Sequence, residues 1–180
     1  MKKIVAIAAL ALVSTNALAG DLGAEVRWGN ETNEQAFTAA QNFNSALGSV
    51  NVGLEVETIN EKAEGLSLNT YTANVGLPFT LGNLKLEPFV QAGVATISLG
   101  PDLTLVGGGL KSELVVAGPL SVGAEYRYRE TVEGPTLVDE RATGFVRVVI
   151  TDKLSVKAVY HNQFNDIDDE QYGLGFAYKF

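Results

Sequence analysis

The sequence predicts an all-β protein, an up-and-down antiparallel β-barrel, from three observations. Apolar residues alternate with polar or small ones at a period of two, which indicates half-buried strands, and no helical periodicity is seen. The alternation restarts five times along the chain. Short turn-forming stretches and longer polar segments follow one another between these restarts, as the connections of successive β-hairpins do.

Each repeat begins at an aliphatic residue that opens an alternating stretch. The five starting residues are Leu22, Val50, Leu84, Leu120 and Leu154. Their spacings are 28, 34, 36 and 34 residues, and 26 residues follow the last start. A repeat of this length fits one β-hairpin with two strands, a tight turn and a moderate loop. Five hairpins predict ten strands, with both ends of the chain on the same side.

The connections support this division. Stretches rich in Gly, Pro, Asn or Asp, suited to tight reversals, precede the later starts at 47–49, 81–83, 117–119 and 151–153. Longer polar segments are expected near 30–36, 58–67, 98–104, 130–140 and 162–171. Tight turns on the periplasmic side and longer loops outside are typical of transmembrane β-barrels. If residues 30–47 form one long loop or plug instead, the strand count falls to eight, and this alternative stays open.

The N-terminus has the pattern of a cleaved signal peptide. Lys2 and Lys3 precede an apolar run over 4–13, and Ala17-Leu18-Ala19 forms a cleavage site before Gly20. The run is too short to span a bilayer as a helix, which needs roughly 20 apolar residues. We therefore expect residues 1–19 to be removed and residues 20–180 to form a single exported barrel domain. The chain has no cysteine, although export permits disulfides, so a closed hydrogen-bond ladder must stabilise it.

The C-terminal strand alternates strictly up to the last residue. One face carries Tyr172, Leu174, Phe176, Tyr178 and Phe180, and the residues between them are small or charged. This strand resembles the closing strand of bacterial outer-membrane β-barrels, which the barrel assembly machinery reads as an insertion signal. The chain is thus similar to small, porin-like outer-membrane barrels. The resemblance implies export through the periplasm to the outer membrane, where lipid and lipopolysaccharide surround the barrel.

Aromatic spacing indicates which face meets lipid. Tyr71 and Tyr172 each lie eight residues before another aromatic, Phe79 and Phe180. In strands tilted by about 40° with a rise of about 3.3 Å per residue, eight residues span roughly 20 Å, near the height of the apolar band. Two aromatic belts at this spacing favour lipid outside over a soluble, lipocalin-like barrel. Pro88 falls on the outward face of a closed barrel, where a local bulge is expected.

Charged residues alternate with the apolar ones and are predicted to face the lumen. The predicted network is Glu25, Arg27, Glu55, Glu57, Lys85, Glu87, Lys111, Glu113, Glu125, Arg127, Arg129, Arg147, Lys157 and the single histidine, His161. With Lys179, six acids face eight bases. Little free bore remains in a barrel of eight to ten strands, and an unpaired buried charge is costly. We therefore expect ion pairs that fill the lumen, with a narrow charged channel as the alternative.

The expected loops are strongly acidic. They carry Lys62 and Arg141 against thirteen acids: Glu31, Glu34, Glu61, Glu64, Asp102, Glu130, Glu133, Asp139, Glu140, Asp166, Asp168, Asp169 and Glu170. The last four offer oxygen ligands of the kind that Ca²⁺ takes, but their spacing differs from that of an EF-hand. A solvated acidic loop is favoured, with divalent cations at the loops as the alternative. The net charge is −8, which becomes about −10 without Lys2 and Lys3 and argues against nucleic acid as a partner.

Catalysis is not expected. Tyr160-His161-Asn162-Gln163 is similar to the motif of outer-membrane lipid A deacylases, but Gln163 stands where that family has a serine. A base without a neighbouring nucleophile does not make a triad. No cofactor motif is present. The sequence thus predicts a structural or surface-interaction barrel that is not an enzyme, with a narrow channel for small solutes or ions as the alternative.

Overall fold

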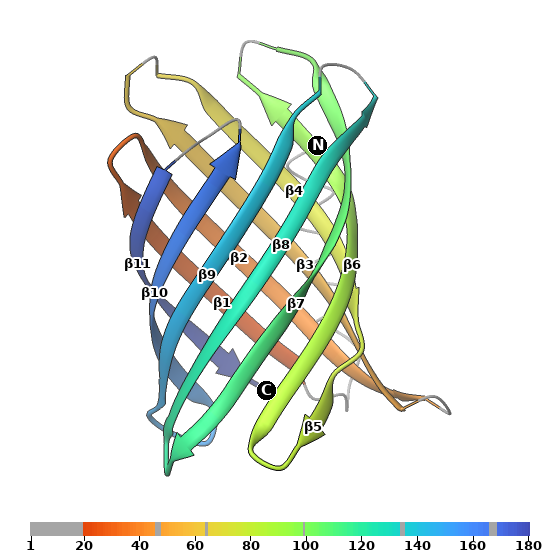
Figure 1. The fold of residues 1–180 in the computed structure, drawn as a ribbon, viewed down its shortest axis with the longest axis vertical. Helices are drawn as coiled ribbons and strands as arrows, with labels where there is room; N and C mark the ends of the chain where they lie inside the picture. Colours follow the sequence, from red (N-terminus) through yellow and green to blue (C-terminus); the bar gives the residue numbers. More distant parts are fainter. Residues whose placement is uncertain (1–19, 46–47, 64, 99, 134–135, 166–168) are drawn as a thin grey trace.

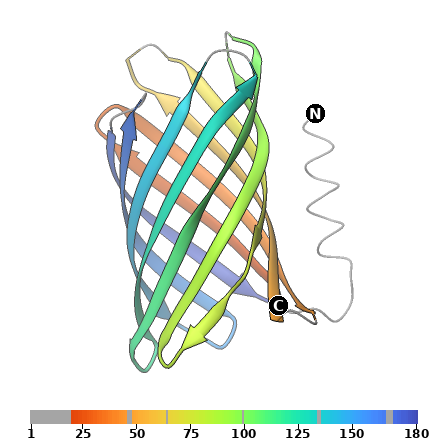
Figure 2. The ribbon, with the colours of Figure 1, turned by 45° about the vertical axis from the view of Figure 1, so that its right-hand side comes forward.

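The computed structural model describes residues 20–45, 48–63, 65–98, 100–133, 136–165 and 169–180, so the predicted signal peptide lies outside the described residues. The described part consists of tilted β-strands around one lumen (Figure 1, Figure 2). None of these residues forms a helix long and apolar enough to cross a membrane. The strands are β1 (Gly20–Gly29), β2 (Thr32–Ser45), β3 (Gly48–Glu61), β4 (Ser67–Gly76), β5 (Phe79–Leu81), β6 (Leu84–Ile97), β7 (Asp102–Ala117), β8 (Leu120–Glu133), β9 (Val138–Val149), β10 (Leu154–Asn165) and β11 (Asp169–Lys179).

The strands close into one antiparallel sheet. Neighbours in the chain pair with each other, β1 pairs with β11, and β4 pairs with β6. Both β4 and β5 pair with β6 in one continuous register, with Gly76 opposite Phe89 and Phe79 opposite Leu86, so together they make one barrel strand. The described residues therefore form a closed up-and-down barrel of ten strands. This confirms the prediction of ten strands and rules out eight.

The two ends of the barrel can be told apart by the chain termini. The terminal end carries Gly20, Phe180 and the connections at 46–47, 82–83, 118–119 and 150–153, and it lies at the bottom of Figure 1. The far end carries the connections at 30–31, 62–66, 98–101, 134–137 and 166–168. These far-end connections are shorter than the moderate polar segments that the sequence predicts there. Most of the described polar residues assigned to loops continue the strands, and the side chains of Glu34, Asp139 and Arg141 find partners inside the lumen.

Pro88 causes no bulge, contrary to expectation. The register on either side of it is unbroken. The β7–β8 ladder has register shifts elsewhere, between Thr104 and Leu105 and between Val115 and Ala117. The Pro88 carbonyl accepts a hydrogen bond from the Leu77 N–H at 3.0 Å. Since the N–H and C=O of a strand residue point to the same side, the missing N–H also faces the break between β4 and β5. One ladder bond is lost there without displacing a residue.

The barrel is apolar outside and polar inside. Large apolar side chains are exposed on the outward face of every wall, for example Val26, Val90 and Val146. Among the described residues, buried polar side chains outnumber buried apolar ones, so the core of this protein is its polar lumen. The aromatic and apolar side chains of the predicted insertion signal are exposed: Tyr172, Leu174, Phe176, Tyr178 and Phe180. Their part in insertion stays a prediction.

Candidate functional site in the barrel lumen

The middle and far part of the lumen contains a buried group of ion pairs, which we name the arginine cluster. Its members are Arg27, Arg127, Arg129, Arg141, Glu34, Glu57 and Asp139. They come from β1, β2, β3, β8 and β9, so the cluster joins opposite walls of the barrel. All seven side chains are at most 8% exposed. The cluster therefore occupies a part of the lumen that water does not fill.

Glu57 is the centre of the cluster. Its Oε1 accepts hydrogen bonds from Arg27 Nη1 at 3.2 Å, Arg127 Nη2 at 3.2 Å and Arg141 Nη1 at 2.7 Å. Its Oε2 accepts from Arg129 Nη2 at 2.9 Å and from the Thr70 hydroxyl at 3.2 Å. The Glu57 side chain has no exposed surface. One carboxylate thus contacts four guanidinium groups, and no other described residue offers the four arginines a shared partner.

The other two acids complete the charge balance. Glu34 Oε1 pairs with Arg27 and accepts from Arg141 Nη1 at 2.9 Å. Asp139 Oδ2 accepts from Arg129 Nε at 2.7 Å, and its Oδ1 accepts from the Gln163 side-chain amide at 3.1 Å. Ion pairs of this kind are stable in a dry interior only when hydrogen bonds satisfy most of their polar atoms. The geometry here meets that condition for the carboxylates of Glu57 and Asp139.

Glycines make room for the arginines. In the strand register, Gly173 lies opposite Arg27, Gly109 opposite Arg127, and Gly107 opposite Arg129. A Cβ on Gly107 would lie 2.0 Å from the Tyr128 carbonyl oxygen, and one on Gly109 would lie 2.1 Å from the Tyr126 carbonyl oxygen. Because these obstacles are backbone atoms, no side-chain movement could relieve them. Gly107 and Gly109 therefore let the backbones of β7 and β8 approach closely where Arg127 and Arg129 leave β8.

An apolar group fills the far end beside the arginine cluster. Ala95, Leu103 and Leu105 are fully buried inside the barrel, and Leu68, Ile97 and Leu137 pack against them. These residues lie on β4, β6, β7 and the segment before β9. The arginine cluster and this apolar group together close the lumen toward the far end.

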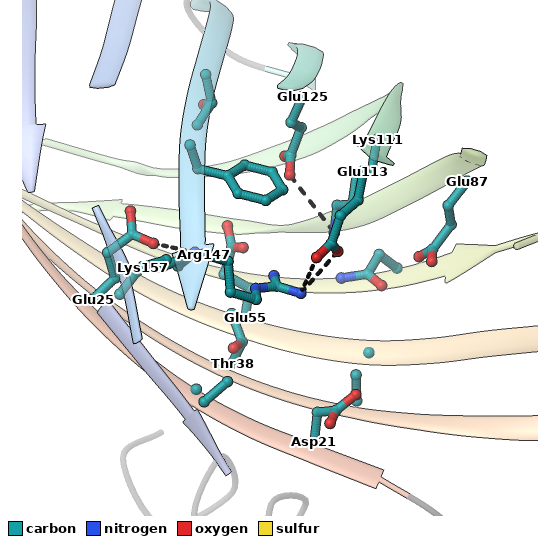
Figure 3. A pocket seen from close by; sticks show the side chains of 18 of the residues that line it. Asp21, Glu25, Thr38, Glu55, Glu87, Lys111, Glu113, Glu125, Arg147 and Lys157 are labelled. Carbon is teal, nitrogen blue, oxygen red and sulfur yellow. Dashed lines mark hydrogen bonds and ion pairs between the residues drawn. The ribbon is translucent and has the colours of Figure 1, made fainter. Parts of the chain in front are cut away.

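The terminal half of the lumen is a cavity of about 290 Å³, which we name the cup (Figure 3). Small inward residues of β1, β2, β3 and β11 line one side of it: Gly23, Ala40, Gly53 and Ala177. The roof of the cup includes Arg27, Arg127 and Arg141 of the arginine cluster. The cup is therefore blind, because the cluster blocks its continuation.

Looser ion pairs line the opposite wall of the cup. Arg147 Nη1 lies 2.8 Å from Glu113 Oε2, Lys111 Nζ lies 3.8 Å from Glu125 Oε2, and Lys85 Nζ lies 3.5 Å from Glu87 Oε2. The side chains of Lys85 and Lys111 are 48% and 38% exposed, in contrast to the buried arginine cluster. Water therefore reaches these groups, and it enters from the terminal end.

Glu25 and His161 connect the two halves. Glu25 pairs with Arg27 and with Lys157, and its Oε1 lies 3.0 Å from His161 Nε2. His161 Nδ1 lies 2.7 Å from the Thr143 hydroxyl oxygen. Glu55 also joins the halves, since it accepts a hydrogen bond from Arg127 Nη1 at 2.8 Å. Thirteen of the fourteen residues named for the lumen network thus have an ion-pair partner inside the barrel, and His161 has a hydrogen-bond partner in Glu25.

Three members of the arginine cluster were assigned to loops from the sequence. Glu34, Asp139 and Arg141 lie in β2 and β9, and all three are buried. With them, the ion pairs of the described residues join eight carboxylates to eight Lys or Arg side chains, rather than six acids to eight bases. The sequence does contain a signal that these residues belong to strands, because the period-two alternation continues through them. Glu34 shares its strand face with Ala36. Asp139 and Arg141 share theirs with Thr143.

The acidic stretch considered for calcium does not offer free oxygens where it is described. Both carboxylate oxygens of Asp169 accept hydrogen bonds from backbone N–H groups at the far end. Glu170 lies on the other face of β11, and Asp166 and Asp168 lie outside the described residues. The described residues contain no group of three or more acidic or histidine side chains able to hold a metal ion. Divalent cations at the acidic loops therefore stay a prediction, and Asp169 itself is occupied by these hydrogen bonds.

Comparisons with solved structures agree with the fold. The β domain of the Bordetella autotransporter BrkA is similar, with 12% identity and a TM-score of 0.59 over 91% of this chain and 100% of that chain. The KdgM porin (11% identity, TM-score 0.54, 89% and 99%) and the NanC porin (16% identity, TM-score 0.52, 91% and 100%) are similar too. No protein-family model matches the sequence, and neither does any curated protein. The chain thus has the fold of the outer-membrane β-barrels.

Proposed function

We propose that this chain is an integral barrel of a bacterial outer membrane with a structural or surface-interaction role and a closed lumen. The terminal end faces the periplasm, and the far end faces outside. The outward face supports a membrane location, because its exposed apolar side chains would be unfavourable in water. The arginine cluster carries the proposal of a closed lumen. Its central carboxylate, Glu57, has no exposed surface, which supports a lumen that is closed to water at this level.

The proposal includes no catalytic activity. Thr143, His161 and Glu25 do stand in the order hydroxyl, imidazole, carboxylate, as in a nucleophilic triad. The third member of a triad, however, must stabilise the imidazolium that forms when the histidine takes a proton. Glu25 already pairs with Arg27 and Lys157, and their positive charges disfavour a second cation beside them. The three groups fit a hydrogen-bonded lumen network better than a reaction centre.

A narrow channel is the second candidate, and the cup favours it. Half of the lumen is already accessible to water, so only the arginine cluster and the apolar group separate it from the far end. Rearrangement of these two barriers would turn the cup into a continuous path. The two candidates therefore differ in one property, namely whether the arginine cluster stays closed in the folded barrel or opens to let solutes pass.

Conductance in a planar lipid bilayer tests the proposal. The mature chain would be folded in detergent, checked for heat-modifiable migration on gels, and then inserted into the bilayer. We expect little or no steady conductance, because paired charges fill the middle of the lumen. Reproducible single-channel steps, with ion selectivity that changes when Arg127 or Arg129 is neutralised, would reject the closed lumen and support the channel.

A further inference from the structure

Asp169, the first residue of the last strand, holds the turn between the first two strands. Its Oδ1 accepts hydrogen bonds from the backbone N–H groups of Asn30 at 3.0 Å and Glu31 at 3.2 Å. Its Oδ2 accepts from the Thr32 N–H at 3.0 Å and from the Thr32 hydroxyl at 2.6 Å. A carboxylate that accepts several backbone N–H bonds makes strong, charge-assisted contacts. Four such contacts therefore tie β11 to the β1–β2 turn.

Further contacts surround this carboxylate. The Gln171 side-chain amide donates to the Thr32 hydroxyl oxygen at 2.6 Å, and Lys62 Nζ donates to the Gly29 carbonyl at 2.6 Å. A Cβ on Gly29 would lie 2.2 Å from Asp169 Oδ2, so a glycine at this position leaves the space for the carboxylate. Asp169, Thr32 and Gln171 are each at most 3% exposed. The residues around Asp169, namely Gly29, Thr32 and Gln171, thus have the size and polarity that these contacts require.

The contacts lie across the seam of the barrel, the ladder between β1 and β11. All other neighbouring strands are joined at one end by a short connection, whereas β1 and β11 come from opposite ends of the domain. Closing a ring through so long a chain segment costs more conformational entropy than closing a hairpin. At the terminal end, backbone hydrogen bonds between Gly20 and Phe180 hold the seam, at 3.4 and 3.0 Å. At the far end, the Asp169 carboxylate takes that place.

We propose that Asp169 is a clasp that keeps the seam between β1 and β11 closed at the far end. By holding the β1–β2 turn, it also keeps Arg27 and Glu34 of that hairpin in the arginine cluster. The clasp acts on the barrel wall, so it does not depend on whether the lumen conducts.

Hydrogen exchange of the mature chain, folded in detergent, tests the clasp. Asp169→Asn keeps the shape of the side chain but turns one acceptor into a donor. We expect exchange to accelerate about tenfold or more at seam amides near Trp28 and Tyr172, since local opening there becomes easier. Amides near Leu22 at the terminal end should be unchanged. The matched control is Asp102→Asn, an exposed aspartate that also begins a strand at the far end.

A rescue experiment separates a clasp from a purely local turn contact. Trp28 and Tyr172 face each other across the seam, so Trp28→Cys with Tyr172→Cys allows a disulfide there. The disulfide should restore seam protection in Asp169→Asn if the clasp acts on the seam. Faster exchange confined to Asn30, Glu31 and Thr32, or no rescue, would overturn the proposal. If Asp169→Asn does not fold, Thr32→Val should give a smaller acceleration at the same seam amides, and its absence would count equally against the clasp.

Discussion

The two halves of the lumen have the same kinds of charged residue and the same strands around them, yet one is sealed and the other holds a cavity. In the far half, Glu57 and four arginines are buried and share hydrogen bonds. In the terminal half, pairs such as Arg147 and Glu113 are partly exposed beside about 290 Å³ of open space. The difference comes from side-chain size on β11, β1, β2 and β3. Where β1, β2, β3 and β11 carry Gly and Ala inward, the cup stays open.

The comparison predicts very different energies for similar carboxylates. Glu57→Ala should be the most damaging single change in the lumen, because it leaves four buried guanidinium groups without their common partner. Breaking a buried pair in this way costs about 3 to 5 kcal/mol of unfolding free energy. Urea titration of the barrel in lipid vesicles measures this cost.

Glu113→Ala in the cup is the matched control. Glu113 accepts bonds from Arg147 and Ser121, but its side chain is 23% exposed, so water can replace the lost contacts. The cost should be about 1 kcal/mol or less. Equal costs for the two variants would mean that the far half is no drier than the terminal half.

A smaller effect is expected from the glycines that face the arginine cluster. Gly109→Ala would place a Cβ 2.1 Å from the Tyr126 carbonyl oxygen, so β7 or β8 must move. Forced backbone shifts of this kind cost about 1 to 3 kcal/mol. Gly144→Ala is the control, because a Cβ there meets no atom within 4 Å. Unfolding titrations that rank the two variants equally would contradict the idea that the close approach of β7 and β8 requires a glycine at position 109.

The sequence predicted the wall of the barrel better than its interior. Alternation of period two is a local property, so the strands β1, β8 and β10 could be recognised from the alternating stretches that start at Leu22, Leu120 and Leu154. Strand β2 was harder to predict, because Gln41 and Ser45 interrupt the apolar alternation of residues 37–45. In the structure, hydrogen-bonded pairing with β1 on one side and with β3 on the other makes this segment a strand despite its weak alternation.

The lumen contains residues that the local sequence pattern could not place. Glu34, Asp139 and Arg141 are polar residues near turns, and such residues usually mark loops. They belong to strands because their partners, Arg27, Arg129 and Glu57, reach them from other strands. Which pairs form depends on the register around the whole barrel, and period-two alternation carries no information about register between distant strands. The clasp at Asp169 was missed for the same reason, since its partners lie at the opposite end of the domain.

Single cysteine substitutions are the smallest of these perturbations, and they test directly where in the lumen water is excluded. The chain has no cysteine, so a single introduced thiol reports on its own surroundings. Thr38 is exposed and lines the cup, whereas Thr70 is 1% exposed and donates to Glu57. In the folded barrel, Thr38→Cys should react with a small water-soluble maleimide at least about a hundredfold faster than Thr70→Cys, because a dry site reacts only through local opening. In denaturant the two rates should converge, which controls for intrinsic reactivity. Similar rates in the folded state would mean that water passes the arginine cluster. That result would reject the proposal of a closed lumen and favour the channel.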